Sequence, residues 1–123
     1  MQSYVAQNKN IELELDIHKV PLSIDQAVPC GLIINEIITN SIKHAFPEQQ
    51  KGKIIITLHK ELNHQVKLIV QDNGIGIPAQ ISLDNPETLG MQIISLLTAQ
   101  IGGKINLKRH RGSVIEITFQ NEE

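Results

Sequence analysis

Aromatic residues and cysteine are scarce in this sequence of 123 residues, and tryptophan is absent. Its aromatic side chains are Tyr4, Phe46 and Phe119. With so few rings, a surface that stacks successive nucleic-acid bases on interleaved aromatic side chains is hard to assemble. The single cysteine, Cys30, cannot form an internal disulfide or a zinc site built from several cysteines. These absences argue against a reader of single-stranded nucleic acid and are consistent with a reducing compartment.

An excess of charge of either sign is also lacking, because eleven Lys and Arg residues stand against thirteen Asp and Glu. The sequence therefore provides no overall attraction to nucleic acid or to an anionic membrane, and an anionic ligand must be bound locally. No apolar run approaches the ~20 residues that span a bilayer, and no signal-peptide pattern is present. We expect a cytoplasmic domain without direct membrane contact, whether or not its parent protein is membrane-bound.

Aliphatic residues, in contrast, are abundant, and 41% of the sequence is hydrophobic while 20% is charged. This composition excludes a disordered tail and fits one compact domain with one core. The first ten residues are polar and irregular, and we interpret them as an N-terminal remnant or linker. Residues 11–123 then form the single predicted domain.

Hydrophobic periodicity, β-rich runs and turn residues together predict a strand, a helix, two strands, a loop, a helix and two strands. Candidate N-caps for the first helix are Ser23 and Asp25, and Pro29 is tolerable only within its first turn. The order of elements predicts an α+β fold, a two-layer sandwich in which helices pack on one face of a mixed, mostly antiparallel sheet. The predicted ranges are 11–17, about 26–45, 53–60, 65–72, the loop 73–87, about 89–101, 104–109 and 113–119.

A first polar cluster lies on the long predicted helix. Glu36, Asn40, Lys43 and His44 occupy positions i, i+4, i+7 and i+8, so they share one stripe of the helix surface. An ordinary solvated helix face explains this spacing about equally well. Asn40 favours a functional stripe, because asparagine is a poor residue for the middle of a helix unless its side chain has a role.

A second cluster, Asp72-Asn-Gly74-Ile-Gly76, directly follows a predicted apolar strand. A simple turn is a strong alternative here, because Asn-Gly is common in hairpins. A turn does not explain two glycines at i and i+2, which would let the backbone approach a flat ligand closely.

A third cluster, Thr88-Leu-Gly90-Met91, begins the second predicted helix. Taken alone, it is more simply explained by N-capping at Thr88 and by a small residue that aids packing. The alternative is that the start of this helix cradles phosphate oxygens, with Gly90 admitting close contact.

Together and in this order, the three clusters resemble the motifs of the GHKL ATPases, which include histidine kinases, the DNA gyrase B subunit, the MutL repair protein and a heat-shock chaperone. The first cluster is similar to the N box, the second to the G1 box, and Leu89-Gly90-Met91 to a shortened G2 box. The resemblance covers about residues 11–119 and implies the Bergerat ATP-binding fold. Residues 29–47 look most like sensor kinases with the HWE-like or second-type dimerisation region.

The resemblance implies roles for the residues that match these motifs. Asp72 would accept a hydrogen bond from the adenine amine, which guanine lacks at that position. Asn40 would supply an oxygen ligand to Mg²⁺, and Glu36 would be catalytic, orienting or deprotonating the attacking group. The implied ATP contacts are Lys43 and His44 to phosphate, Gly74 and Gly76 beside the base, backbone N–H groups of Gly90 and Met91 to the triphosphate, and Ser113 through water to adenine.

The function implied is that of the catalytic domain of a sensor histidine kinase, which transfers the γ-phosphoryl of Mg·ATP to a histidine. That histidine would lie on a dimerisation domain absent from this chain, with a response regulator downstream. Residues 79–87 would form a lid over the nucleotide. Two alternatives stay open, an anti-sigma-type serine kinase and a nucleotide-gated binding module with little turnover.

Overall fold

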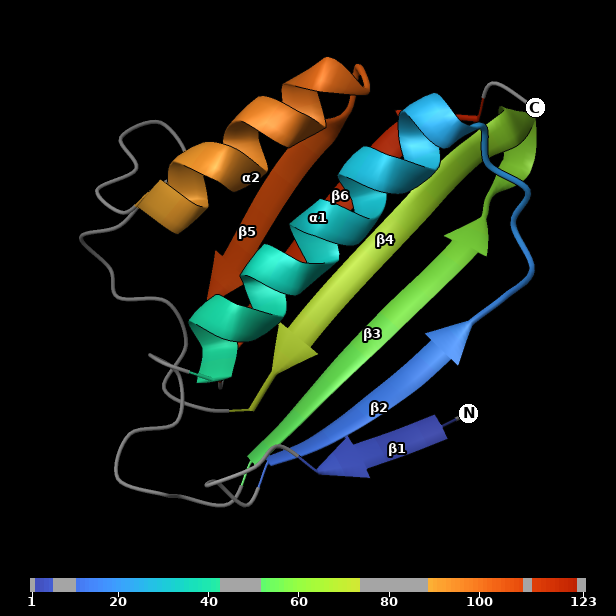
Figure 1. The fold of residues 1–123 in the computed structure, drawn as a ribbon. Coiled ribbons are helices and arrows are strands. Elements are labelled where there is room, and N and C mark those ends of the chain that lie inside the picture. The colour runs from blue at the N-terminus through green and yellow to red at the C-terminus, as the bar shows by residue number, and fades with distance from the viewer. Residues whose placement is uncertain (1, 6–10, 43–51, 74–88, 110–111, 122–123) are drawn as a thin grey trace.

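The computed structural model describes residues 2–5, 11–42, 52–73, 89–109 and 112–121 (Figure 1). Within these ranges the chain forms six strands and two long helices, and a short 3₁₀ turn, η3 (Leu62–His64), joins the two central strands. The elements in order are β1 (Gln2–Val5), β2 (Ile11–Ile17), α1 (Ile24–Asn40), β3 (Gly52–Lys60), β4 (Gln65–Asp72), α2 (Leu89–Gln100), β5 (Lys104–Arg109) and β6 (Ser113–Gln120).

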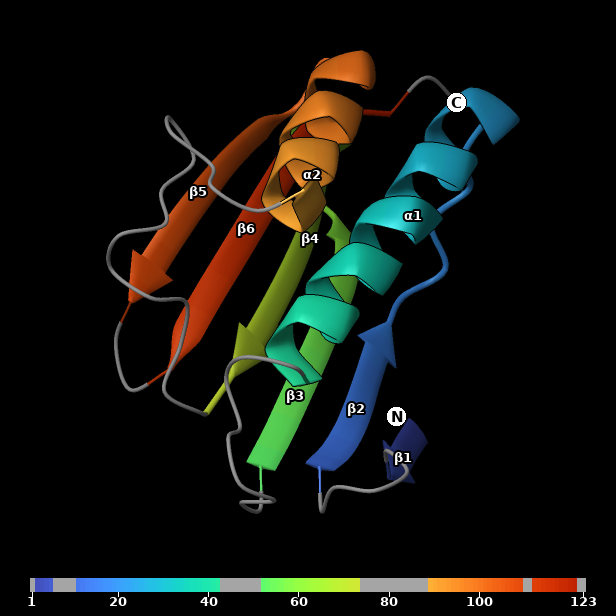
Figure 2. The same ribbon diagram turned by 60° about the vertical axis from the view of Figure 1, so that its left-hand side comes forward.

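The six strands form one sheet in the order β1-β2-β3-β4-β6-β5. Strand β2 runs parallel to β3, and all other neighbouring pairs are antiparallel. Helices α1 and α2 lie side by side on one face of this sheet (Figures 1 and 2). The predicted α+β two-layer sandwich with a mixed, mostly antiparallel sheet is therefore confirmed.

The core lies between the sheet and the two helices. Alternate residues of each central strand point into it, so β3 and β4 both show a period-two burial pattern. Helix α1 contributes Ile33 and Ile37, and α2 contributes Met91 and Ile94. Ile34, Ile38 and Ile42 are partly buried at the edge of this core. The side of α1 that carries Ile33 and Ile37 therefore faces the sheet, and Ile34, Ile38 and Ile42 lie beside it.

Helix α1 differs from the prediction at both ends. It begins at Ile24 because the backbone carbonyl of Ser23, the N-cap residue, accepts hydrogen bonds from the N–H groups of Gln26 and Ala27. Pro29 consequently lies in the second turn rather than the first, where its ring leaves the helix one hydrogen bond short. The α-helix ends at Asn40 and continues through Ser41 and Ile42 as a wider π-type turn, and the predicted end at Ala45 lies outside the described residues.

Strand β1 is an element that the sequence analysis did not expect. It pairs antiparallel with β2, and Gln2 to Val5 lie opposite Leu15 to Glu12. The predicted domain boundary at Ile11 stays a prediction. Neither helix in the described part of the chain has the length and apolar character needed to cross a membrane.

Candidate functional site

The carboxylate of Asp72 lies at the end of β4 and is fixed by its neighbour in β6. Asp72 pairs with Ser113, the first residue of β6, and the Ser113 hydroxyl donates a hydrogen bond of 2.5 Å to Asp72 Oδ2. Both residues are buried, with 8% and 3% of their surfaces exposed. A hydroxyl donor held beside a carboxylate orients the acceptor oxygens before any ligand arrives. The structure thus brings together two of the predicted site residues.

Gly112, the residue before β6, lies against the backbone of Asp72. Its φ angle is +116°, which residues with a side chain rarely adopt. A Cβ atom at this position would overlap the Asp72 carbonyl oxygen and lie 2.9 Å from the Asp72 carbonyl carbon. Sequence patterns do not reveal this contact, because a glycine before a strand is explained locally and its approach to β4 depends on the position of β6 in the sheet.

Asn73 extends the β3–β4 pairing by one residue beyond Asp72. Its N–H donates to the carbonyl of Lys53 at 3.2 Å, and its side-chain Oδ1 accepts from the N–H of Lys53 at 2.8 Å. These two bonds fix the direction of the chain as it leaves β4. Gly74 and Gly76, the glycines of the predicted G1 box, lie outside the described residues, as do residues 79–87 of the predicted lid.

The ends of the two helices meet at Asn40 and Gly90. Asn40 is the last residue of α1, and Gly90 lies in the first turn of α2. An ideal Cβ built at Gly90 would lie 2.8 Å from Asn40 Nδ2, so the amide packs directly on the glycine backbone. Glu36 lies one turn before Asn40 on α1, and both side chains are half-buried. Asn40, Glu36 and Gly90 therefore stand close to one another along the facing ends of the helices.

Of the remaining predicted site residues, the structure describes Met91 but not Lys43 or His44. The Met91 side chain is buried in the core, with 3% of its surface exposed, and its backbone lies in the first turn of α2 beside Gly90. Lys43 and His44 lie outside the described residues. The roles of all these residues toward a nucleotide stay predictions.

Mg²⁺ is a cation that the oxygen of an amide such as Asn40 can bind beside phosphate. Across residues 11–42, 52–73, 89–109 and 112–121, no three His, Cys, Asp or Glu side chains gather closely enough to hold a metal ion. Mg²⁺ keeps several waters and usually takes one or two protein oxygens besides phosphate. The amide oxygen of Asn40 fits this pattern.

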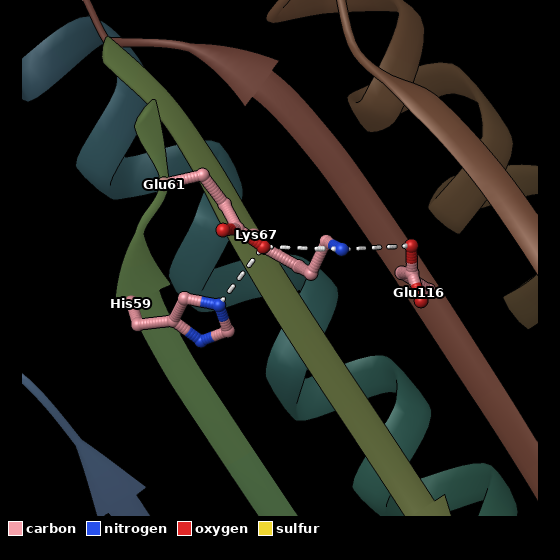
Figure 3. A network of polar contacts seen from close by, with 4 residues as sticks. All are labelled: His59, Glu61, Lys67 and Glu116. Carbon is pink, nitrogen blue, oxygen red and sulfur yellow. Dashed lines mark hydrogen bonds and ion pairs between the residues drawn. The ribbon is translucent and has the colours of Figure 1, made fainter. Parts of the chain in front are cut away.

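A separate group of charged side chains lies on the sheet face opposite the helices (Figure 3). Glu61 Oε1 lies 3.1 Å from Lys67 Nζ and 3.2 Å from His59 Nε2. Lys67 Nζ also lies 3.5 Å from Glu116 Oε1. Lys67, and to a lesser degree His59, holds the pKa of Glu61 below its usual value. Because these contacts join β3, β4 and β6 on the face away from Asn40, the cluster stabilises the sheet rather than the site.

The six-stranded sheet with two helices on one face is the fold of histidine kinase ATPase domains. The structure is similar to the histidine kinase domain of a blue-light-activated histidine kinase from Erythrobacter litoralis, with a TM-score of 0.85 and 26% identity. That match covers 91% of this chain and 52% of the other. A likeness to the histidine kinase AdeS of Acinetobacter baumannii, with a TM-score of 0.75 at 21% identity, shows the shared fold; it covers 93% of this chain and 56% of that one.

Sequence comparison leads to the same family. The family model "Histidine kinase-, DNA gyrase B-, and HSP90-like ATPase" matches residues 25–123, and the chain belongs to this family. It is 27% identical over 108 residues to blue-light-activated histidine kinase 2 of Erythrobacter litoralis and 31% identical over 96 residues to the sensor histidine kinase PdtaS of Mycobacterium tuberculosis. These matches cover 87% and 75% of this chain but only 31% and 19% of the two relatives.

Proposed function

We propose that this chain binds Mg·ATP and transfers the γ-phosphoryl to a histidine on a dimerisation domain that lies outside these 123 residues. The observation that carries the proposal is the carboxylate of Asp72, buried at the end of β4 and hydrogen-bonded by Ser113. Removing a carboxylate from water is unfavourable unless it is hydrogen-bonded. In a chain of an ATPase family, a carboxylate buried at the end of β4 is best explained as a base-recognition group.

Adenine is the base that such a group selects. A carboxylate only accepts hydrogen bonds, so it pairs with the exocyclic amine of adenine and repels the oxygen that guanine carries at the equivalent position. Ser113 holds one carboxylate oxygen from the side of β6. Gly74 and Gly76 would let the backbone approach the base.

The phosphate end of the site would lie where the helices meet. Asn40 would supply an oxygen to Mg²⁺, which when bound offsets the negative charge of the phosphates. Glu36, one turn away, would orient or deprotonate the attacking nitrogen. Lys43 and His44 would contact phosphate, while Gly90 and Met91 would offer backbone N–H groups at the start of α2.

The acceptor histidine is proposed to belong to another domain. His59 pairs with Lys67, which precedes Asp72 by five residues, roughly 17 Å of strand. His64 lies still further from Asp72, at the start of β4, and the N–H of His18 binds the carbonyl of Leu58 beside His59. These three histidines therefore lie toward the other end of the sheet. The relatives are named as histidine kinases, one of them as a sensor histidine kinase, which supports a dimerisation domain as partner and a response regulator downstream.

A phosphotransfer assay tests this proposal. The chain alone, given γ-labelled ATP and Mg²⁺, should take up negligible label, because transfer needs an acceptor placed in line with the phosphoryl group. Adding the histidine-bearing dimerisation domain of the same gene product should give acid-labile label on that domain. Label on a serine or threonine of a partner would indicate a serine kinase instead, and nucleotide binding without any transfer would indicate a binding module.

A further inference from the structure

The amide of Asn40 rests on the backbone of Gly90, at the place where a side chain of residue 90 would begin. An ideal Cβ at Gly90 would lie 2.8 Å from Asn40 Nδ2, 2.9 Å from Oδ1 and 3.2 Å from Cγ. The two ends of the amide are almost equally close, so a side chain at residue 90 would meet the amide in either of its two orientations. Any side chain at residue 90 must therefore displace this amide.

The surrounding structure makes the amide, rather than a helix, the part that would move. Ile33 and Ile37 anchor α1 in the core with 0% and 2% of their surfaces exposed. Met91 and Ile94 anchor α2 with 3% and 0% exposed. Close-packed cores resist shifts of whole elements, whereas a half-buried side chain at a helix end can rotate toward solvent. Replacing Gly90 should thus reorient Asn40 without unfolding the domain.

A second helical glycine provides the contrast. Gly31 lies within α1, and a Cβ built there would meet nothing within 4 Å. Glycine is, after proline, the least favourable residue in a helix. The described structure therefore offers no steric reason for a glycine at residue 31. At residue 90 the Asn40 side chain is such a reason, because it leaves no space for a Cβ.

We propose that Gly90 is a positioning residue. Because it has no side chain, the Asn40 amide can lie against its backbone in the orientation that binds the metal. The inference rests on the proposed function, in which Asn40 supplies the oxygen ligand to Mg²⁺. It differs from the role of Gly90 as a backbone N–H donor to phosphate. The two roles separate experimentally, because Gly90→Ala keeps the N–H group. A loss of the Mg²⁺ enhancement reports on Asn40, whereas a loss of affinity that is equal in Mg²⁺ and EDTA reports on the phosphate contact.

The geometric part is tested without nucleotide. In the ligand-free chain, Gly90→Ala should shift the side-chain NH₂ resonances of Asn40 in nitrogen-labelled NMR spectra, while Gly31→Ala, the matched control, should leave them in place. Both variants should remain folded, with unchanged core resonances. Unmoved Asn40 resonances in a folded Gly90→Ala chain would overturn the inference.

The functional part is tested by calorimetric titration with ATP, once in Mg²⁺ and once in EDTA. Gly90→Ala should reduce the enhancement of affinity by Mg²⁺ roughly 10-fold or more, the range seen when a group that orients a metal ligand is removed. Affinity in EDTA should fall less than affinity in Mg²⁺. Asn40→Ala should lose the enhancement as well, and the double variant should lose no more than Asn40→Ala alone. Gly31→Ala should titrate as the unaltered chain does.

The outcomes separate this inference from the proposed function. An intact Mg²⁺ enhancement in Gly90→Ala, or an equal loss of affinity in Mg²⁺ and EDTA, overturns the positioning role and leaves the proposed function standing. An unaltered chain that binds ATP without any Mg²⁺ enhancement overturns both the metal role of Asn40 and this inference.

Discussion

The hydroxyl of Ser113 donates to Asp72 Oδ2 across 2.5 Å, although the two residues are 41 positions apart in the sequence. They are also paired in the sheet, Asp72 as the last residue of β4 and Ser113 as the first of β6. The hydrogen bond therefore couples the candidate adenine-binding carboxylate to the strand that follows the β5–β6 turn.

Ser113→Ala should lower the free energy of unfolding by about 1.5–3 kcal/mol, because it removes a hydrogen bond to a buried charged group. ATP affinity should fall with it, since the carboxylate loses the donor that orients it. Ser113→Thr keeps the hydroxyl and serves as the control. Denaturant unfolding and calorimetry measure the two effects, and an Ala variant as stable as the Thr variant would contradict the coupling.

Asp72→Asn should weaken ATP binding by about 1.5–3 kcal/mol, the value for a hydrogen bond that involves a charged partner. The unaltered chain should prefer ATP to GTP, and the variant should lose much of that preference because its amide both donates and accepts. Competition calorimetry with the two nucleotides checks this. Equal affinity of the unaltered chain for ATP and GTP would refute the assignment of Asp72.

Gly112→Ala should destabilise the chain by roughly 1–3 kcal/mol or more, because it combines an unfavourable backbone conformation with overlap on the Asp72 carbonyl. Gly102→Ala is a matched control: Gly102 also has a positive φ of 66°, but a Cβ there would meet nothing within 4 Å. A larger loss at residue 112 reflects both the contact with the Asp72 carbonyl and the less accessible φ of 116°. Thermal unfolding of both variants is sufficient, and equal losses would mean that the contact with β4 is unimportant.

Glu61 should support stability above about pH 4.5 and lose that contribution in acid. Lys67 and, secondly, His59 lower its pKa in the folded state from the ordinary value of 4.5. The unfolded chain therefore takes up the proton first as the pH falls, and stability declines as the pH passes through the lowered folded pKa. Melting temperatures between pH 3 and pH 7 should show a shallower acid decline for Glu61→Gln.

Lys67→Met tests the same linkage from the other partner. It should also flatten the acid decline, because the main cause of the lowered Glu61 pKa has been removed. An acid decline that keeps its full slope in both variants would show that other carboxyl groups control it.

Local patterns in the sequence were sufficient for most of the elements. Period-two alternation predicted β2, because burial of one sheet face imposes that period, and runs of β-favouring residues predicted β3 and β4. These three strands and both strands of the last hairpin lie within a residue or two of their predicted bounds. Strand β1 escaped prediction, since its residues have no alternating apolar pattern and it pairs only at the edge of the sheet. Helix α1 begins two residues before its predicted start, because backbone hydrogen bonds to the Ser23 carbonyl decide where the helix begins.

The sequence by itself determined the family motifs, the period of each strand and helix, and hence the residues that enter the core. Tertiary structure alone decided that β6 lies between β4 and β5, which brings Ser113 to Asp72 and Gly112 onto its backbone. It also decided that α1 and α2 meet at Asn40 and Gly90. The physical reason is that periodicity reports which face of an element is buried, whereas contacts between distant residues depend on how whole elements pack against one another.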